Sequence, residues 1–273
     1  MDYEKYFNLI NIGNSQEALE YKNAEIPDVV YKYYSLTDDE KMNEQKLRTL
    51  ENGKVYLSSL AGFNDPFEGN SLIFDNEKLA KAGWSVDFLE KFVSELKTHV
   101  RICCFSNAKE KQQNMPMWAY YANNHKGYCV EYKLDSKLKK QMYPVSYDEK
   151  RSSGNVLITS LLNELVKISQ QHEDINENTD EYLTMLSYMS YLTFTCKHIS
   201  WRHEREIRLL LPDVCGDYVD MQPEKIYVGM QCEDRYMKEL LRISKKFEKN
   251  CKVYKMDGIG NDFNHFLLER ELK

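Results

Sequence analysis

The stretch Lys197–Leu211, KHISWRHEREIRLLL, decides how the fold is interpreted. Glu204, Glu206 and Arg208 alternate along what reads as a β-strand that runs into three leucines. Successive side chains of a strand point to opposite faces, so the three charges are expected on one face and Ile207 on the other. Buried charges need partners, because an uncompensated ion inside a protein is costly. The row therefore predicts either a paired structural network or the wall of a polar cleft.

The overall composition predicts one soluble globular domain spanning residues 1–273. The chain is 42% hydrophobic and 29% charged. No apolar run approaches the roughly 18 residues that a membrane-spanning helix needs. The first residues are polar and show no signal-peptide pattern, so we expect a cytoplasmic location and no membrane partner. No segment has the composition of a linker.

Several classes of site are disfavoured by the sequence. The seven cysteines are scattered and include no CxxC pair, which argues against a disulfide framework or a zinc site. His198 and His203 are five positions apart, whereas the HExxH zinc motif needs four, so we expect no metal there. A net charge of -6 argues against broad nucleic-acid binding. Neither a Walker loop, nor GxGxxG, nor a serine-nucleophile elbow is present.

Short β-prone runs are separated by helices without strict alternation, which predicts an α+β fold. Residues 1–25 are expected to form a helical N-terminal appendage, and residues 153–196 an inserted helical pair. The remaining expected helices lie at 38–53, from Ser85 onward, at 115–122 and at 234–247. Strands are expected at 29–34, 54–58, 100–105, 128–134, 144–147, 225–228 and 252–256.

A turn with a clear mechanism lies at Phe63–Gly69. Pro66 has a fixed φ and pushes Asp65 into an extended conformation, while Asn64 can bond its own backbone. Residues on a rigid turn are frequent site residues, so Asn64, Asp65 and Glu68 are candidates for lining a cleft.

Several stretches, taken in order, resemble a bacterial family catalogued as domain of unknown function 2971. The resemblance covers roughly residues 29–230 and implies a shared fold. The stretches are Tyr31–Tyr33, Phe63–Glu68, Cys104–Ser106, Met117–Gly127, and Lys197 with Trp201, Glu204, Glu206 and Arg208.

A second resemblance, at the level of the fold, is to ADP-ribosyltransferases. It implies a small split mixed or antiparallel sheet that holds NAD, with flanking helices. Lys32 stands where that fold carries His or Arg, Tyr121 or Tyr120 takes the place of the nicotinamide stacker, and Glu206 or Glu204 that of the catalytic carboxylate. The rest of the implied cofactor site is Tyr33, Trp118, Ser106 and Arg208, with Lys197 a further cleft candidate.

The resemblance implies NAD-dependent ADP-ribosyl transfer or NAD glycohydrolysis, in the setting of a bacterial toxin or defence effector. The expected partner is a nucleotide-like small molecule, and the sequence does not identify the acceptor macromolecule. Each candidate also has a structural interpretation, because Trp118 and Tyr121 could pack in a core and Glu204, Glu206 and Arg208 could form a purely structural network.

Two other functions stay open. Asp65, with Glu131 and Lys133 on one strand face, could hold Mg²⁺ in a metal-dependent nuclease. Alternatively, the chain is a non-enzymatic interaction module whose aromatic cleft binds a nucleotide or a peptide.

Overall fold

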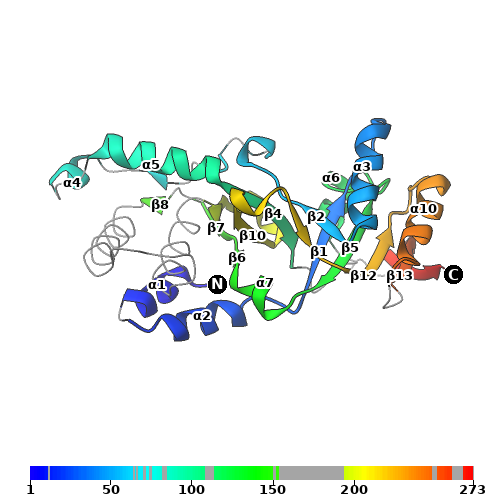
Figure 1. Ribbon diagram of the computed structural model, residues 1–273, viewed down its shortest axis with the longest axis horizontal. Helices are drawn as coiled ribbons and strands as arrows, with labels where there is room; N and C mark the ends of the chain where they lie inside the picture. Colours follow the sequence, from blue (N-terminus) through cyan, green and yellow to red (C-terminus); the bar gives the residue numbers. More distant parts are fainter. Residues whose placement is uncertain are drawn as a thin grey trace.

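The chain folds around a mostly antiparallel β-sheet with helices grouped on both sides of it, as the computed structural model shows (Figure 1). This confirms the predicted α+β class. The structure describes residues 1–273 except 12, 64, 66, 70–71, 74–75, 82–84, 108–113, 150–151, 154–193, 248–250, 260–266 and 273.

The main sheet has eight strands in the described part of the chain, and every neighbouring pair is antiparallel except β12 with β13. Its strands, in spatial order, are β14 (Leu267–Leu272), β13 (Lys252–Ile259), β12 (Pro223–Val228), β5 (Tyr128–Lys133), β1 (Val29–Tyr34), β4 (Val100–Ser106), β10 (Glu206–Pro212) and β6 (Met142–Pro144).

Three two-stranded sheets border the main one. They pair β2 (Lys54–Tyr56) with β11 (Tyr218–Asp220), β3 (Leu72–Ile73) with β8 (Ser152–Ser153), and β7 (Ser146–Asp148) with β9 (Cys196–His198). The helices are α1 (Tyr3–Asn11), α2 (Ser15–Ala24), α3 (Glu40–Glu51), α4 (Asn76–Lys81), α5 (Val86–His99), α6 (Met115–Tyr120), α7 (Ser136–Lys140) and α10 (Asp234–Ser244), with 3-10 turns η1 (Leu60–Gly62), η2 (Ile199–Glu204) and η3 (Asp213–Cys215).

The sheet splits between β1 and β4. Strand β1 pairs with β5 along its whole length, but it pairs with β4 only at Tyr31 and Ser106. Farther along the same edge of β4, Ser58 forms a bridge with Ile102 through two backbone hydrogen bonds of 2.8 Å. The edge of β4 between these two attachments therefore opens into a gap instead of continuing the sheet.

Helices α3 and α10 stand side by side over one face of the sheet (Figure 1). Helix α3 begins where the acidic run predicts, because the Asp39 side chain accepts a hydrogen bond from the Met42 amide at 3.0 Å. The main hydrophobic core lies on this face, and its fully buried members include Val30, Leu57, Leu209 and Leu240. The pattern of β10 follows from this core, since Ile207, Leu209 and Leu211 face it.

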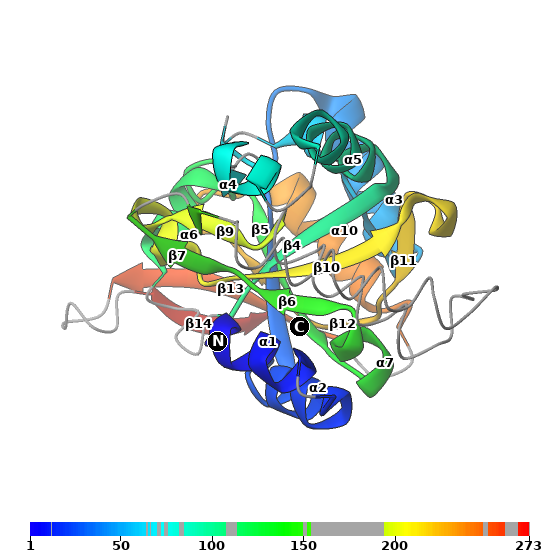
Figure 2. The ribbon, with the colours of Figure 1, turned by 90° about the vertical axis from the view of Figure 1, so that its left-hand side faces the viewer.

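The N-terminal helices pack closely on the rest of the chain. Tyr6 of α1 is 1% exposed, and Lys22 of α2 is completely buried. The Lys22 ammonium donates to the backbone carbonyls of Lys139, Lys140 and Met142 at 3.3, 2.5 and 3.1 Å. Figure 2 shows both helices below β6 and beside α7. One buried ammonium thus connects α2 to the end of α7.

The predicted helical pair at 153–196 lies almost entirely outside the described residues. Strand β14 falls in the C-terminal tail, where no element was predicted, and it extends the sheet by pairing with β13. Within the described ranges, no helix is long and apolar enough to cross a membrane.

Candidate functional site

A cavity of about 590 Å³ occupies the split in the sheet. Its walls are formed by strand β1, the edge of β4, helices α3 and α6, and the segments around Ser58 and Glu204. The lining residues are Tyr31, Lys32, Tyr33, Tyr34, Ser35, Met42, Gln45, Lys46, Thr49, Tyr56, Ser58, Gly62, Phe63, Ile102, Cys104, Phe105, Ser106, Met117, Tyr121, Lys197, Glu204, Glu206 and Tyr218.

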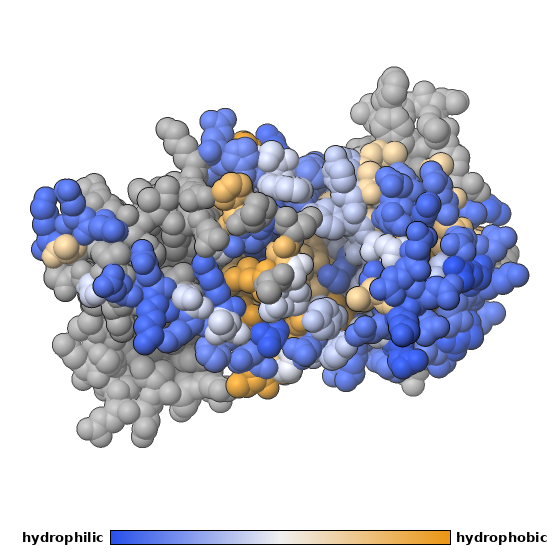
Figure 3. All heavy atoms as spheres, turned by 90° about the horizontal axis from the view of Figure 1, so that it is seen from above, coloured by the Kyte–Doolittle hydropathy of each residue, from blue (hydrophilic) through white to orange (hydrophobic). Residues whose placement is uncertain are grey.

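Side chains from both faces of the sheet reach this cavity because β1 and β4 separate there. Tyr33 belongs to the cluster under α6, whereas Tyr34 packs against the main core on the other face, yet both line the cavity. In the view from above (Figure 3), apolar residues gather near the middle of the molecule, while hydrophilic residues dominate the right-hand side, where α3 and α10 lie.

Arg208 is the centre of a buried ion-pair network beside the cavity. It is 0% exposed, and its guanidinium donates to both oxygens of Glu206 at 2.9 Å and to both oxygens of Glu68 at 2.7 and 2.8 Å. Its remaining N–H donates to the Phe194 carbonyl at 2.5 Å. All five donors of the guanidinium are therefore used. Arg208, a predicted cofactor ligand, instead holds Glu206 and Glu68.

Lys197, on β9, completes the network. Its ammonium lies 2.7 Å from Glu204, 3.3 Å from Glu68 and 3.5 Å from Glu206. Burial opposes the charge of Lys197, but the three glutamates outweigh burial and raise its pKa. A loop residue, Glu68, thus contacts both cations. It was predicted as a cleft candidate, but it does not line the cavity.

The pKa values of Glu204 and Glu206, the two glutamates that line the cavity, are shifted in opposite directions. Burial would raise the pKa of Glu206, but Arg208 and Lys197 outweigh burial and lower it to about 2. Burial raises the pKa of Glu204, and the negative charge of Glu206 raises it further. Three carboxylates and two cations leave this network with one excess negative charge when all five are ionised. Glu204 is the member placed to take up a proton.

Glu204 does not lie on the strand, contrary to the predicted alternation. It is the last residue of η2, and the next residue, Arg205, has a left-handed φ of 45° that breaks the period of two before β10 begins. The Ser106 hydroxyl donates to the Glu204 carbonyl at 2.7 Å, and the Tyr121 hydroxyl donates to the Glu204 carboxylate. Glu204 therefore reaches the cavity from a turn that Ser106 and Tyr121 hold in place.

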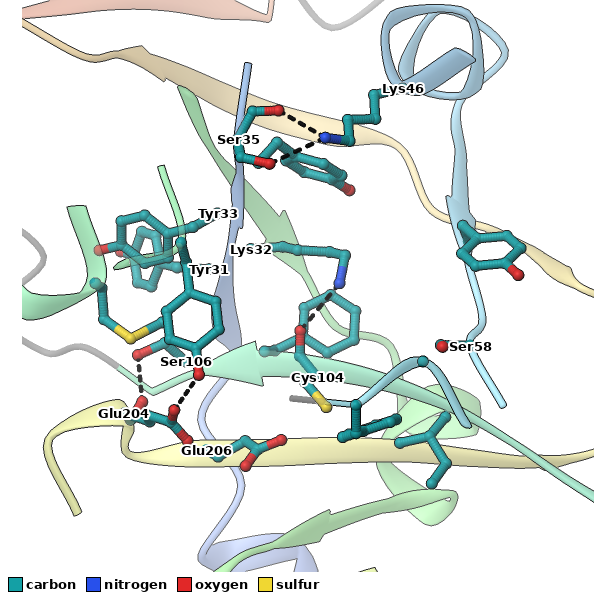
Figure 4. Close-up of a pocket in the computed structure, with 18 of the residues that line it drawn as sticks. Tyr31, Lys32, Tyr33, Ser35, Lys46, Ser58, Cys104, Ser106, Glu204 and Glu206 are labelled. Atoms are coloured by element: carbon teal, nitrogen blue, oxygen red, sulfur yellow. Dashed lines mark hydrogen bonds between the residues drawn. The ribbon is translucent and has the colours of Figure 1, made fainter. Parts of the chain in front are cut away.

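Lys32 points into the middle of the cavity (Figure 4). Its ammonium donates to the Cys104 carbonyl at 3.3 Å, on the edge of β4 left open by the split. Within the described residues, no salt bridge of 4.0 Å or less joins it to a carboxylate. Burial opposes its charge, but interactions with Cys103, Cys104 and Glu206 outweigh burial and raise its pKa. The rings of Tyr34 and Phe105 lie 5.6 and 5.7 Å from the ammonium. Lys32 is therefore a cation available to an anionic ligand.

The structure brings most predicted site residues together. Those that line the cavity are Lys32, Tyr33, Ser106, Tyr121, Lys197, Glu204 and Glu206. Trp118 is 2% exposed and packs between Tyr33 and His125 under the sheet, so it is a core residue and not a cavity wall. Asp65 is 6% exposed, and its carboxylate accepts a hydrogen bond from the Phe67 amide at 2.9 Å. This bond stabilises the turn at 63–69. Asn64 lies outside the described residues.

Sequence reasoning missed the outer part of the cavity. Lys46 of α3 donates to the Ser35 carbonyl and hydroxyl at 2.8 and 3.0 Å. Tyr56 and Tyr218 are 48% and 41% exposed at the cavity wall. The sequence signal was weak, because each tyrosine lies in a short strand and the residues two positions away, on the same strand face, are not apolar.

Glu131, a carboxylate of the nuclease hypothesis, has partners of its own on the sheet. The Glu131 carboxylate accepts hydrogen bonds from Lys225 at 2.6 Å and Tyr227 at 2.7 Å. It lies on the sheet face opposite the main core, since its neighbours in sequence, Val130 and Tyr132, face that core. Among the residues that the structure describes, no group of three or more His, Cys, Asp and Glu side chains could hold a metal ion.

The comparison with known families gives one match. The model of a family described as "Protein of unknown function (DUF2971)" matches residues 117–209, about a third of the chain. This is narrower than the expected 29–230: it includes Tyr121, Glu204, Glu206 and Arg208 but not Lys32. No curated protein and no solved structure matches the chain. The comparisons therefore give no support to the resemblance to ADP-ribosyltransferases.

Proposed function

We propose that the cavity binds an NAD-like nucleotide and that the chain transfers its ADP-ribosyl group to an acceptor or to water. The observation that carries the proposal is the charge arrangement of the cavity. The Lys32 ammonium, which makes no salt bridge within the described residues, faces a network with one excess negative charge, and aromatic side chains line the same cavity. The volume of about 590 Å³ falls within the range of ligand pockets.

Lys32 supports the part of the proposal that concerns the phosphates. A buried ammonium is costly unless its charge and its three N–H donors are satisfied. The Cys104 carbonyl satisfies one of them. The pyrophosphate of a dinucleotide would supply a direct ion-pair partner and further acceptors.

The glutamates support the part that concerns the reaction. The bond between the anomeric carbon and the nicotinamide nitrogen breaks, and its electron pair neutralises the positive ring nitrogen. Positive charge then develops on the ribose, where the ionised Glu206 is the fixed anion that stabilises it. The attacking hydroxyl of the acceptor or of water loses its proton to Glu204, whose raised pKa suits a general base.

The contacts of Tyr121 support the role of Glu204 as the general base. Its hydroxyl donates to one oxygen of Glu204 and Lys197 donates to the other at 2.7 Å. These bonds fix the carboxylate at the acidic end of the cavity, so that it needs no rearrangement when it accepts the proton. The ring of Tyr121 also lines the cavity and leaves an aromatic wall for a nicotinamide ring.

The direct test is to incubate the purified chain with NAD and candidate acceptors and to measure nicotinamide release. We expect release by the wild type, loss of release for Glu206→Gln and Lys32→Met, and no change for the surface control Glu239→Gln on α10. Circular dichroism and thermal melting check that each variant is folded. No release by the wild type with any acceptor or with water, or equal release by Glu206→Gln, would overturn the proposal.

One observation favours a second candidate, a nucleotide-binding module without catalysis. Both oxygens of Glu206 already accept hydrogen bonds from Arg208, so its charge is partly used by the network. Such a module would show a rise in melting temperature with NAD but no nicotinamide release. A role as a toxin or defence effector belongs to the first candidate only, because it requires a modified target or the consumption of NAD.

A further inference from the structure

Two exposed tyrosines form the outer wall of the cavity. Tyr56 and Tyr218 are directly opposite each other in the β2–β11 pair, with ring centroids 5.5 Å apart and an interplanar angle of 62°. They remain 48% and 41% exposed although both line the cavity. Large aromatic residues that are left half-exposed on a concave wall are typical of binding surfaces.

The wall contributed by α3 adds a flexible apolar side chain and two polar ones. Met42 is 45% exposed, and Gln45 and Thr49 come from the same helix. An unbranched thioether adapts to a flat ring, and the Gln45 amide can donate to and accept from its polar edge. The Thr49 hydroxyl donates to the Gln45 backbone carbonyl at 2.8 Å, so it can accept from the ring. This combination suits a heteroaromatic base better than an aliphatic or purely charged group.

The chemical groups follow an order along the cavity. Figure 4 shows Tyr31, Tyr33 and Glu204 at one end, Lys32 in the middle and Ser58 at the other end. Ser58 lies two residues beyond Tyr56, on the segment that leads from β2 to the edge of β4. A ligand that matches this order has a ribosyl end at the glutamates, an anionic centre at Lys32 and a flat ring at the far end.

We infer that Tyr56 and Tyr218 bind the second base of a dinucleotide, so that the ligand is a dinucleotide and not a mononucleotide or a ribosyl phosphate. This inference rests on the proposed function, because it names the substrate class of the same cavity. Stacking on an aromatic ring tolerates any base, so the tyrosines set the length of the ligand more than the identity of its second base.

The experiment measures binding by calorimetry with three probes: carba-NAD, which resists cleavage of the glycosidic bond, AMP, and nicotinamide mononucleotide. The variants are Tyr56→Ala, Tyr218→Ala and Tyr218→Phe, each checked by thermal melting. Tyr120→Ala is the matched control. Tyr120 was the alternative to Tyr121 as nicotinamide stacker, but it is 71% exposed and does not line the cavity, whereas Tyr121 does.

We expect Tyr218→Ala and Tyr56→Ala to weaken the binding of carba-NAD and AMP about 5- to 100-fold, as loss of one stacked base does. Binding of nicotinamide mononucleotide should stay within about twofold of wild type, and Tyr218→Phe and Tyr120→Ala should bind all three probes normally. These results would support the assignment of the base to this wall.

The possible failures are distinguishable. If the wild type binds none of the three probes, the proposed function falls and this inference falls with it. If the wild type binds carba-NAD but both alanine variants bind it equally well, only this inference is overturned. Only this inference is overturned, too, if the variants lose affinity for nicotinamide mononucleotide to the same extent as for carba-NAD.

Discussion

The Arg208 guanidinium donates to both carboxylate oxygens of Glu206, from Nε to Oε1 and from Nη2 to Oε2, each at 2.9 Å. The two residues are neighbours on one face of β10, and Glu68 approaches the same guanidinium from a distant loop. A charge cluster that lines a cavity is thus also a connection between the sheet and the 63–69 turn.

Arg208→Met should lower the free energy of unfolding by about 3–5 kcal/mol, because it leaves two buried carboxylates without their main partner. Urea unfolding measures the change. Arg242→Met is the control, since it removes ion pairs on the exposed surface of α10 and should have a much smaller effect. Equal losses for the two variants would contradict a special role of the buried network.

Glu206 should make the free energy of unfolding decrease as the pH falls. Its pKa is about 2 in the folded chain against an ordinary 4.5, so its contribution is fully present above pH 4.5 and is lost as the pH falls from 4.5 to about 2. The stability difference between wild type and Glu206→Gln should shrink over this window by an amount on the order of 3 kcal/mol. Urea titrations at fixed pH values measure it, and a difference that stays constant would refute the assignment.

The contribution of Glu204 to stability should change with pH in the opposite direction. Because its folded pKa is raised, the folded state binds the proton more tightly than the unfolded chain does. Its contribution is therefore present at low pH and is lost as the pH rises above 4.5. Compared with Glu204→Gln, the wild type should lose relative stability in that direction in the same titrations. A gain in relative stability with rising pH would show that the two glutamates have been assigned the wrong way round.

Lys22→Met should destabilise the chain by about 1–3 kcal/mol, because one buried and two part-buried carbonyls lose their donor. Burial lowers the pKa of Lys22 to about 7, below that of an exposed lysine. The unfolded chain then binds more protons between pH 7 and 10.5, so wild-type stability should gain over the variant as the pH rises through this range. Lys5→Met, on the exposed side of α1, is the control for thermal and urea unfolding.

Asn124→Gly should be tolerated, and Asn124→Val should destabilise the chain by about 1–2 kcal/mol. Asn123, Asn124 and His125 all have positive φ, at 47°, 53° and 66°, and they close the end of α6. The exposed side chain of Asn124 makes this a test of backbone conformation alone, because a β-branched residue fits this region poorly. Urea unfolding of the two variants decides it, and a valine variant as stable as the glycine variant would count against backbone strain.

Local signals predicted most elements. The tyrosine and valine run of β1 falls at 29–34 as expected, and the acidic residues before α3 mark its first turn. These features depend on near neighbours in the sequence, which is why propensity and capping could find them. The charges of Glu206 and Arg208 on one face of β10 follow from the same kind of local rule.

Other features depend on contacts that no local pattern contains. The left-handed Arg205 removes Glu204 from the strand, although arginine carries no signal for that conformation. Trp118 and Tyr121 share a helix end, but only the position of α6 under the sheet decides that the first is core and the second lines the cavity. The outer wall of tyrosines and α3 side chains arises from segments far apart in the chain.

The split in the sheet has a consequence for size. Tyr31 and Ser58 both attach to one edge of β4, at Ser106 and Ile102, and four residues of a strand span about 13 Å. Strand β10 holds the opposite edge of β4 along its full length. The distance between the two attachments is therefore set by the rise per residue of β4, so that inserting or deleting one residue in this interval would change the length of ligand that fits.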